Sequence, residues 1–252
     1  MNLSDRTNIV LISGKVRAGK DQLAEFLKER LEEKGLSVVK RNLADSLKES
    51  FAQVFPHLVK GTKEDIRAGW IKYASLCRAV NAYVWCDHTA EYLRQVTEGD
   101  LVEWVIIPDV RYFFELHYWA QKAINNGANL YVIRLSVTRS EQYNRLGTDG
   151  YLKYVSKGAY KDPSETQLDY LESCSKSSDR HAYFHELFKD LVWPQLSVFD
   201  NSAEGYDALG EYADLFLKMG NHVQGLEDFS QVCLALACEL GPEPAALYTT
   251  LT

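Results

Sequence analysis

Residues 8–22, which read NIVLISGKVRAGKDQ, decide the fold. Asn8–Ser13 is a short apolar run rich in β-branched residues, and such a run predicts a buried strand. Asp21–Lys34 carries apolar residues three and four positions apart, which predicts an amphipathic helix that ends at Gly35. Gly14–Lys20 is a turn that contains two glycines. The sequence therefore predicts a strand, a tight turn and a helix in direct succession.

The turn matches G-x-x-x-x-G-K, the phosphate-loop pattern, in the strand-to-helix context that this pattern requires. Its glycines let successive backbone N–H groups point toward a phosphate, and the helix N-terminus adds a positive dipole end. The ammonium of Lys20 can follow negative charge during phosphoryl transfer. We therefore expect the phosphates of a nucleotide to be bound by Gly14, Lys15, Val16, Arg17, Ala18, Gly19, Lys20, Asp21 and Gln22.

Asp21 stands where the common pattern has the Ser or Thr that binds Mg²⁺. A carboxylate can also hold Mg²⁺, directly or through water. Alternatively, Asp21 only caps the first helical turn. The sequence predicts Mg²⁺ as a cofactor, with Asp21 and Asp109 as the candidate metal ligands.

Apolar runs and helical patterns alternate along the rest of the chain. This alternation predicts a three-layer α/β sandwich around a five-stranded parallel sheet with right-handed crossovers. We place a phosphate-loop domain at residues 1–220 and an extension of unassigned role at 221–252. Within the domain we expect a helical insertion at about 44–100 and a lid at about 146–166. The expected strands after the first are Ser37–Asn42, Glu103–Val110, Asn129–Val137 and Leu196–Asn201, and the expected helices are Ala44–Phe55, Glu64–Val96 with one or two breaks, Tyr112–Asn125, Ser140–Leu146, Glu165–Ser173, Tyr206–Met219 and Val223–Leu240.

Composition excludes several classes of protein. The chain has 252 residues, 46% hydrophobic and 25% charged, which is ordinary for a globular protein and not for a disordered one. Its formal net charge of −7 disfavours a general nucleic-acid or membrane-surface binder. Five scattered cysteines, with no metal-ligand spacing, are typical of free thiols in a reducing cytosol. With no signal peptide and no bilayer-length apolar run, we expect a cytoplasmic protein without a nucleic-acid or membrane partner.

Two residues at the predicted end of the third strand could take part in catalysis. Parallel α/β sheets bind ligands at the carboxyl ends of their strands. Arg111 could clamp an acceptor phosphate through two hydrogen bonds, or it could be a surface residue paired with Glu115. Asp109 could hold Mg²⁺, orient Arg111 or form a structural salt bridge. Gly147–Pro163, with three glycines and three lysines, predicts a mobile loop or a helical lid.

The segment GKVRAGKD, residues 14–21, resembles the phosphate loop of the deoxynucleoside monophosphate (dNMP) kinases of tailed bacteriophages and of the related phosphomevalonate kinases. Those families carry Asp after the loop lysine, often followed by Thr, where this chain has Gln22. The resemblance covers roughly residues 8–215. Further matches follow in the expected order: LADSLK at 43–48, Arg67, Arg78 and Trp85, Asp109-Val110-Arg111 with Glu115, SET at 164–166, and Asp200-Asn201.

The resemblance implies a nucleoside monophosphate kinase-like enzyme with ATP and dNMP as its partners, and a host cytoplasmic location if a phage encodes it. It implies catalytic roles for Lys20, Arg111, Asp109 and Arg145, and roles in ATP binding for Arg139 and Asn201 beside the loop. It assigns the acceptor to Asp45, Lys48, Arg67, Arg78, Trp85, Arg111 and Glu165.

Other interpretations stay open at this point. The chain could phosphorylate another phosphorylated small molecule such as phosphomevalonate, or bind nucleotide without fast transfer. The second is disfavoured because the sequence lacks the Asp-x-x-Gly and Asn-Lys-x-Asp motifs of nucleotide switches. Arg78, in an apolar helical stretch, needs either a ligand or a buried carboxylate as partner. Core packing is the alternative role for Trp85. The sequence does not fix the accepted bases or the oligomeric state, for which a homodimer is one option.

Overall fold

The computed structural model describes residues 7–60, 63–98, 101–156, 159–161, 163–169, 197–202, 208–219, 223 and 226–240. Cys174, the second half of the expected helix Glu165–Ser173 and the start of the expected helix Tyr206–Met219 lie outside these ranges. Among the described cysteines, Cys77, Cys86 and Cys233 are free thiols. Among the described helices, none has the length and apolar character that a bilayer crossing requires.

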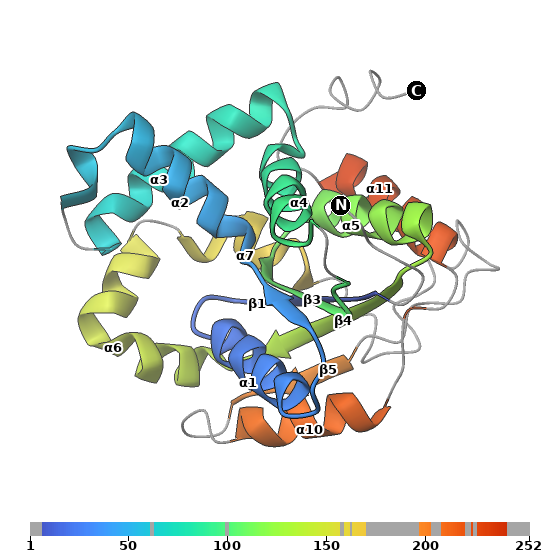
Figure 1. Cartoon of the computed structure of the whole chain (residues 1–252). Coiled ribbons are helices and arrows are strands. Elements are labelled where there is room, and N and C mark those ends of the chain that lie inside the picture. The colour runs from blue at the N-terminus through green and yellow to red at the C-terminus, as the bar shows by residue number, and fades with distance from the viewer. Residues whose placement is uncertain are drawn as a thin grey trace.

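Five parallel strands form one sheet in the order β2-β3-β1-β4-β5, which confirms the expected fold class. β1 lies at the centre, so the loop that follows it emerges between the carboxyl ends of β3 and β4 (Figure 1). The strands differ from their expected bounds by a few residues at most: β1 Asn8–Gly14, β2 Val38–Lys40, β3 Trp104–Val110, β4 Asn129–Ser136 and β5 Ser197–Asp200.

Helices cover both faces of this sheet (Figure 1). α1 and α10 lie on one face, while α4, α5 and α11 lie on the other. α2, α3 and α6 stand beyond the carboxyl ends of the strands. The bounds are α1 Lys20–Glu32, α2 Leu43–Val54, α3 Lys63–Val80, α4 Val84–Val96, α5 Phe113–Asn126, α6 Arg139–Ser156, α7 Pro163–Thr166, α10 Ala208–Met219 and α11 Leu226–Leu240, with 3₁₀ turns η1 at Leu58–Lys60 and η2 at Ala159–Lys161.

The apolar run of β1 supplies both cores, because successive side chains of a strand point to opposite faces. Ile9 and Leu11 pack toward α5, and Val10 and Ile12 pack toward α1. All four side chains are fully buried. A parallel strand covered on both faces needs such a continuous apolar run, which is the pattern that identified this segment in the sequence.

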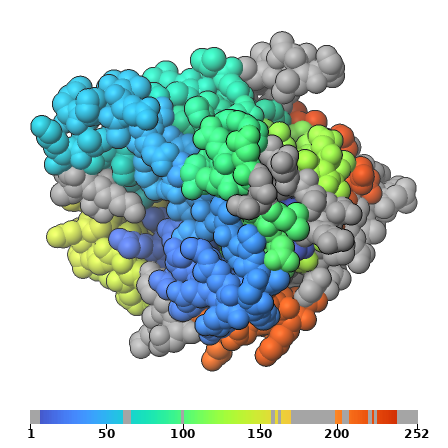
Figure 2. All heavy atoms as spheres, in the orientation of Figure 1, coloured from blue at the N-terminus to red at the C-terminus, as the bar shows by residue number. Residues whose placement is uncertain are grey.

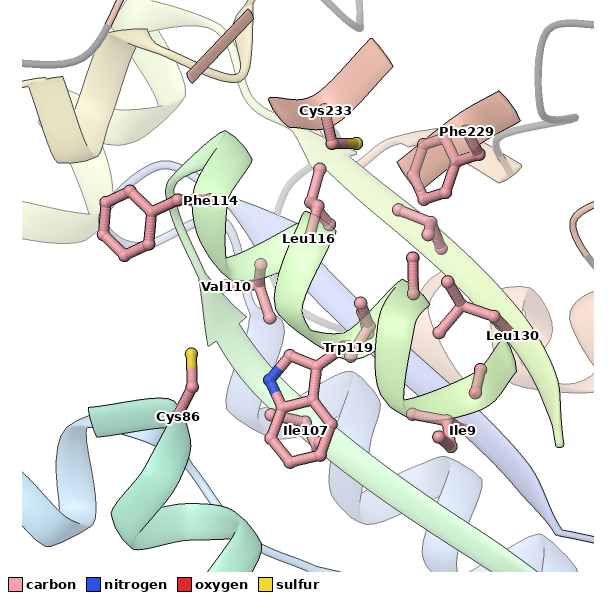
Figure 3. Packing of buried hydrophobic residues seen from close by; sticks show 14 of the residues in the cluster. Ile9, Cys86, Ile107, Val110, Phe114, Leu116, Trp119, Leu130, Phe229 and Cys233 are labelled. Carbon is pink, nitrogen blue, oxygen red and sulfur yellow. The ribbon is translucent and has the colours of Figure 1, made fainter. Parts of the chain in front are cut away.

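Figure 3 shows the larger core around α5. Trp119 of α5 is fully buried and lies near Ile107 of β3. On another side of the same helix, Leu116 lies close to Cys233 of α11. α11 begins beyond residue 220, in the part expected to be an extension, and it packs along α5. The buried residues of α11 are therefore part of the main core. The division of the chain into a domain and an extension stays a prediction.

Two helical regions differ in detail from the expectation. The long region Glu64–Val96 is broken once, at Asn81, whose side-chain oxygen accepts a hydrogen bond from the N–H of Tyr83. α6 runs through much of the expected lid, but Gly147 interrupts it with φ 69° and ψ 166°. The first part of the expected lid is thus helical with a kink at Gly147. Glycine explains the kink, because it adopts positive φ readily.

Candidate active site

The phosphate loop connects β1 to α1 at the centre of the sheet. In Figure 2 its dark blue atoms reach the surface beside the yellow atoms of α6. A Cβ at Gly14 would lie 2.8 Å from the carbonyl oxygen of Leu135, so only glycine fits there. Gly19 (φ 96°) and Arg17 (φ 61°) both have positive φ, which turns the chain tightly around the loop interior. The loop therefore has the shape that its glycines predict.

Lys20 is the first residue of α1 and is only 7% exposed. Its ammonium donates to the carbonyl oxygens of Gly14 (2.7 Å) and Lys15 (2.9 Å). It also lies 3.4 Å from Oδ1 of Asp109. Burial lowers the pKa of Lys20, although the carboxylate of Asp109 opposes that shift. The ammonium thus holds both ends of the loop together and links them to β3.

Asp109 sits at an irregularity in the sheet. Ile12 pairs with Pro108 and Ser13 pairs with Val110, so Asp109 is left out of the β1–β3 register. It has φ 72°, which is a strained conformation for a residue with a side chain. Bulges of this kind redirect side chains next to active sites. The strain at Asp109 is compensated by ion pairs with Lys20 and Arg111.

Arg111 lies between two acidic side chains. Its guanidinium contacts Oδ1 of Asp109 at 2.8 Å and Oε1 of Glu165 at 2.6 Å. Burial favours the neutral form of both members of the Asp109–Arg111 pair, but each stabilises the other's charge. The pKa of Asp109 is accordingly below its usual range and that of Arg111 above it. Only the backbone N–H of Arg111 contacts Glu115, so the alternative of a guanidinium pair with Glu115 is not what the structure shows.

Glu165 of α7 joins the loop to this cluster. Its Oε2 accepts a hydrogen bond of 2.8 Å from the N–H of Val16. Arg67 of α3 lies 3.9 Å from its Oε1, and the hydroxyl of Tyr154 donates to its Oε2 over 3.4 Å. The residue is only 3% exposed. Segments that are far apart in the sequence therefore meet at one carboxylate.

The other side of the loop is held by Arg145 and Asn201. Arg145 donates to the carbonyl oxygens of Arg17 (3.1 Å) and Asn201 (2.7 Å), and its Nε contacts Glu141 at 2.7 Å. The amide of Asn201 donates to the carbonyl oxygen of Ala18 over 2.9 Å. The structure thus brings two predicted donor-side residues together at the loop. Arg139, at the start of α6, is exposed.

Asp21 is exposed in the first turn of α1. The N-cap position of this helix is Gly19, and Oδ1 of Asp21 accepts a hydrogen bond from the amide of Asn42 over 3.2 Å. Asp21 therefore contacts the start of α2 instead of capping its own helix. An exposed carboxylate beside a phosphate loop fits a Mg²⁺ ligand. Asp109 fits less well, because Lys20 and Arg111 already neutralise it.

The predicted acceptor residues fall into two groups. Arg67 and Arg111 meet at Glu165, next to the loop. The others have structural partners: Asp45 accepts the N–H of Asn42 in a capping box and pairs with Lys48, Arg78 pairs with Glu115 at 3.6 Å and lies over the ring of Tyr112, and Trp85 is buried beside Tyr73. For Arg78 the buried carboxylate, left open by the sequence, is the partner found. Burial and the charge of Arg78 oppose each other at Glu115, and burial prevails, so the pKa of Glu115 is raised.

Sequence reasoning missed a second carboxylate on the segment that carries Glu165. Asp169 contacts the ammonium of Lys15 at 2.9 Å and the guanidinium of Arg134 at 2.7 Å. Arg134 in turn donates to the hydroxyl of Ser13 over 2.8 Å. The sequence contained one signal for this contact: Arg134 lies in the middle of a buried strand, and a buried guanidinium needs a carboxylate partner.

One family model matches part of this chain. The model of the phosphomevalonate kinase family matches residues 12–125, which is less than half of the chain. The matched part runs from the end of β1 into α5 and includes the phosphate loop, β2, β3 and Arg111. The chain has an α/β fold in which the central strand of a five-stranded parallel sheet leads into a phosphate loop.

The solved structures that match this chain are distant from it in sequence. A protein from Chloroflexus aurantiacus, named only provisionally as a kinase, is 15% identical and has a TM-score of 0.42; the match covers 87% of this chain and all of that one. The Mycobacterium tuberculosis APS kinase CysC, solved with AMPPNP and APS, is 11% identical with a TM-score of 0.37 and coverages of 85% and 97%. These likenesses say nothing about the substrate. A search of the curated proteins finds no match.

Proposed function

We propose that this protein transfers the γ-phosphoryl group of ATP to the phosphate of a small phosphorylated acceptor. One observation carries the proposal: Oδ1 of Asp109 contacts both Lys20 (3.4 Å) and Arg111 (2.8 Å). The cation of the donor loop and the candidate acceptor cation therefore share one carboxylate. Phosphoryl transfer needs such positive charge around both the donor and the acceptor phosphate.

The proposed step needs little covalent chemistry from the protein. An acceptor phosphate oxygen forms a bond to the γ-phosphorus, and the bond from that phosphorus to the β–γ bridging oxygen breaks, which releases ADP and leaves a diphosphate on the acceptor. Lys20 would stabilise charge on the β- and γ-phosphates, and Arg111 and Arg67 would hold the acceptor phosphate. Mg²⁺, bound by Asp21 and the phosphates of ATP, would neutralise charge on the donor.

Phosphomevalonate is the acceptor that the family comparison supports, because the matching model is that of phosphomevalonate kinase. The matched residues 12–125 include the phosphate loop, the helices α2 to α4 and Arg111. Phosphomevalonate carries a phosphate and a carboxylate, and both groups require basic partners of the kind that Arg67 and Arg111 provide.

A dNMP is the second candidate acceptor. The motifs Asp109-Val110-Arg111 and SET, on which the resemblance to dNMP kinases rests, are 54 residues apart, yet Arg111 and Glu165 are in contact at 2.6 Å. This contact makes the two motifs parts of one site. The indole N–H of Trp85 also has no hydrogen-bond acceptor within the described part of the chain.

An assay of ADP release separates these functions. The purified full chain is incubated with Mg²⁺-ATP and, one at a time, phosphomevalonate, the four dNMPs and the four ribonucleoside monophosphates. We expect ADP release that depends on an acceptor; turnover with phosphomevalonate alone supports the first candidate, and turnover with dNMPs supports the second. A folded protein that releases no ADP with any of these acceptors contradicts both.

Asp21→Ser tests the proposed metal ligand. It replaces a charged oxygen ligand by the neutral hydroxyl of the common motif, so we expect the Mg²⁺ concentration for half-maximal turnover to rise by about threefold to tenfold while the fold is retained. Asn42→Ser is the matched control, because it removes the amide that donates to Asp21 and keeps a side chain that can cap α2. If the Mg²⁺ titrations of wild type and Asp21→Ser overlay, Asp21 does not bind the metal.

A further inference from the structure

Glu165 holds a set of donors that normally bind phosphate. Its Oε2 accepts from the backbone N–H of Val16 at 2.8 Å, and its Oε1 contacts the guanidinium of Arg111 at 2.6 Å. Arg67 adds a second guanidinium at 3.9 Å. Loop amides together with arginine side chains are the groups that bind phosphate oxygens in proteins. The carboxylate of Glu165 therefore lies where a phosphate group could bind.

The position of Val16 in the loop indicates which phosphate of a nucleotide would bind there. The amides at the helix end of a phosphate loop cradle the α- and β-phosphates, while the loop lysine reaches the β- and γ-phosphates. Val16 lies at the strand end of the loop and is joined through Glu165 to Arg111, the residue after β3. The Val16 amide is thus on the γ-phosphate side, between the donor loop and the candidate acceptor cation.

Charge repulsion opposes the binding of Glu165 and a γ-phosphate at the Val16 amide at the same time. Glu165 is 3% exposed, so water screens it little, and two adjacent anions in such a site repel strongly. Lys20 and Arg111 are already paired with Asp109. Arg111 and Arg67 contact Glu165 as well, so a γ-phosphate at this place would compete with Glu165 for the same guanidinium groups.

We propose, on the basis of the proposed function, that Glu165 and the γ-phosphate of ATP compete for the Val16 amide, and that Glu165 leaves Val16 when a triphosphate binds. Glu165 is then a positioning residue: it holds Arg111 and the loop in place before ATP arrives and competes with the γ-phosphate. ADP, which lacks that phosphate, leaves Glu165 undisturbed.

Glu165→Gln tests this competition, because it removes the charge and keeps the size of the side chain. Calorimetric titration of the full chain, with Mg²⁺ present, measures the Kd of AMPPNP and of ADP. We expect the Kd of AMPPNP to fall by about tenfold and that of ADP to change by less than about twofold. Thermal unfolding shows that the variant is folded. If it does not fold, Glu165→Asp replaces it, because the shorter side chain keeps the charge and reaches Val16 less well.

Asp169→Asn is the matched control. Asp169 lies on the same segment but contacts the side chains of Lys15 and Arg134 instead of a loop amide. We expect this variant to change the two Kd values by the same factor. The ratio of the two Kd values is therefore the quantity to compare between the variants.

The outcomes also separate this inference from the proposed function. If wild type binds both nucleotides and Glu165→Gln changes both Kd values equally, or weakens AMPPNP, the inference is wrong and the kinase proposal stands. A decrease in kcat with an unchanged AMPPNP Kd is equally contrary to it, since Glu165 would then act only by orienting Arg111. If neither protein binds AMPPNP, the inference and the ATP donor site both fail.

Discussion

Lys20→Ala is expected to lower kcat by about 10²- to 10³-fold, because the loop lysine stabilises charge that develops in the transition state. The structure adds a second reason. The ammonium also bonds to the carbonyl oxygens of Gly14 and Lys15, so its removal leaves the loop less well ordered. Steady-state ADP release, with circular dichroism to verify folding, measures the effect.

Lys28→Ala is the control for this prediction. Lys28 lies on the same helix and pairs with Glu32 at 3.7 Å, away from the loop. An exposed ion pair of this type contributes little to stability, so this variant should keep its kcat. A folded Lys20→Ala protein with near-normal kcat would show that the loop does not support phosphoryl transfer.

Arg111→Ala is expected to reduce kcat/KM for the acceptor by about 10²-fold or more, with a much smaller change in the KM for ATP. It is also expected to destabilise the protein by about 3–5 kcal/mol, because the carboxylates of Asp109 and Glu165 lose their shared partner. Initial rates with each substrate varied in turn, together with urea unfolding, measure the two effects separately.

Arg111→Lys distinguishes charge from geometry at this position. Lysine keeps the positive charge but has no planar pair of donors, so stability should recover more than acceptor use does. A larger effect of Arg111→Ala on the KM for ATP than on that for the acceptor would assign Arg111 to the donor side instead.

The sequence predicted the fold well because its strongest signals are local. A buried parallel strand needs a continuous apolar run, and a phosphate loop needs glycine where Leu135 approaches Gly14. The positions of Lys20 and Arg111 followed from this, since the carboxyl ends of the strands meet at one edge. The candidate site was predictable to the extent that its residues come directly after strands.

Contacts between distant segments were not predictable in the same way. The bond between Val16 and Glu165 joins residues 149 positions apart, and nothing in either local sequence indicates it. The positive φ of Asp109 arises from the register of two strands, not from a glycine. Arg78 illustrates an intermediate case: its apolar surroundings required an anion, but only the fold identified Glu115 as that partner.

The sequence predicted a helix at Val223–Leu240, and the structure has it as α11, Leu226–Leu240. Phe229, Val232, Cys233 and Leu236 follow helical spacing, and all four are buried in the core around α5. The residues between α10 and α11 gave no comparable pattern, so the sequence did not tie this helix to the main core.

The packing of α11 on α5 has a consequence for synthesis of the protein. The apolar face of α5 is completed only by the helix that ends at Leu240. At about 5–20 residues per second, the roughly 100 residues between the two helices take on the order of 5–20 s to translate. Throughout that interval the nascent chain displays Leu116 and its apolar neighbours to the solvent at the ribosome, where a chaperone that recognises apolar segments can bind them.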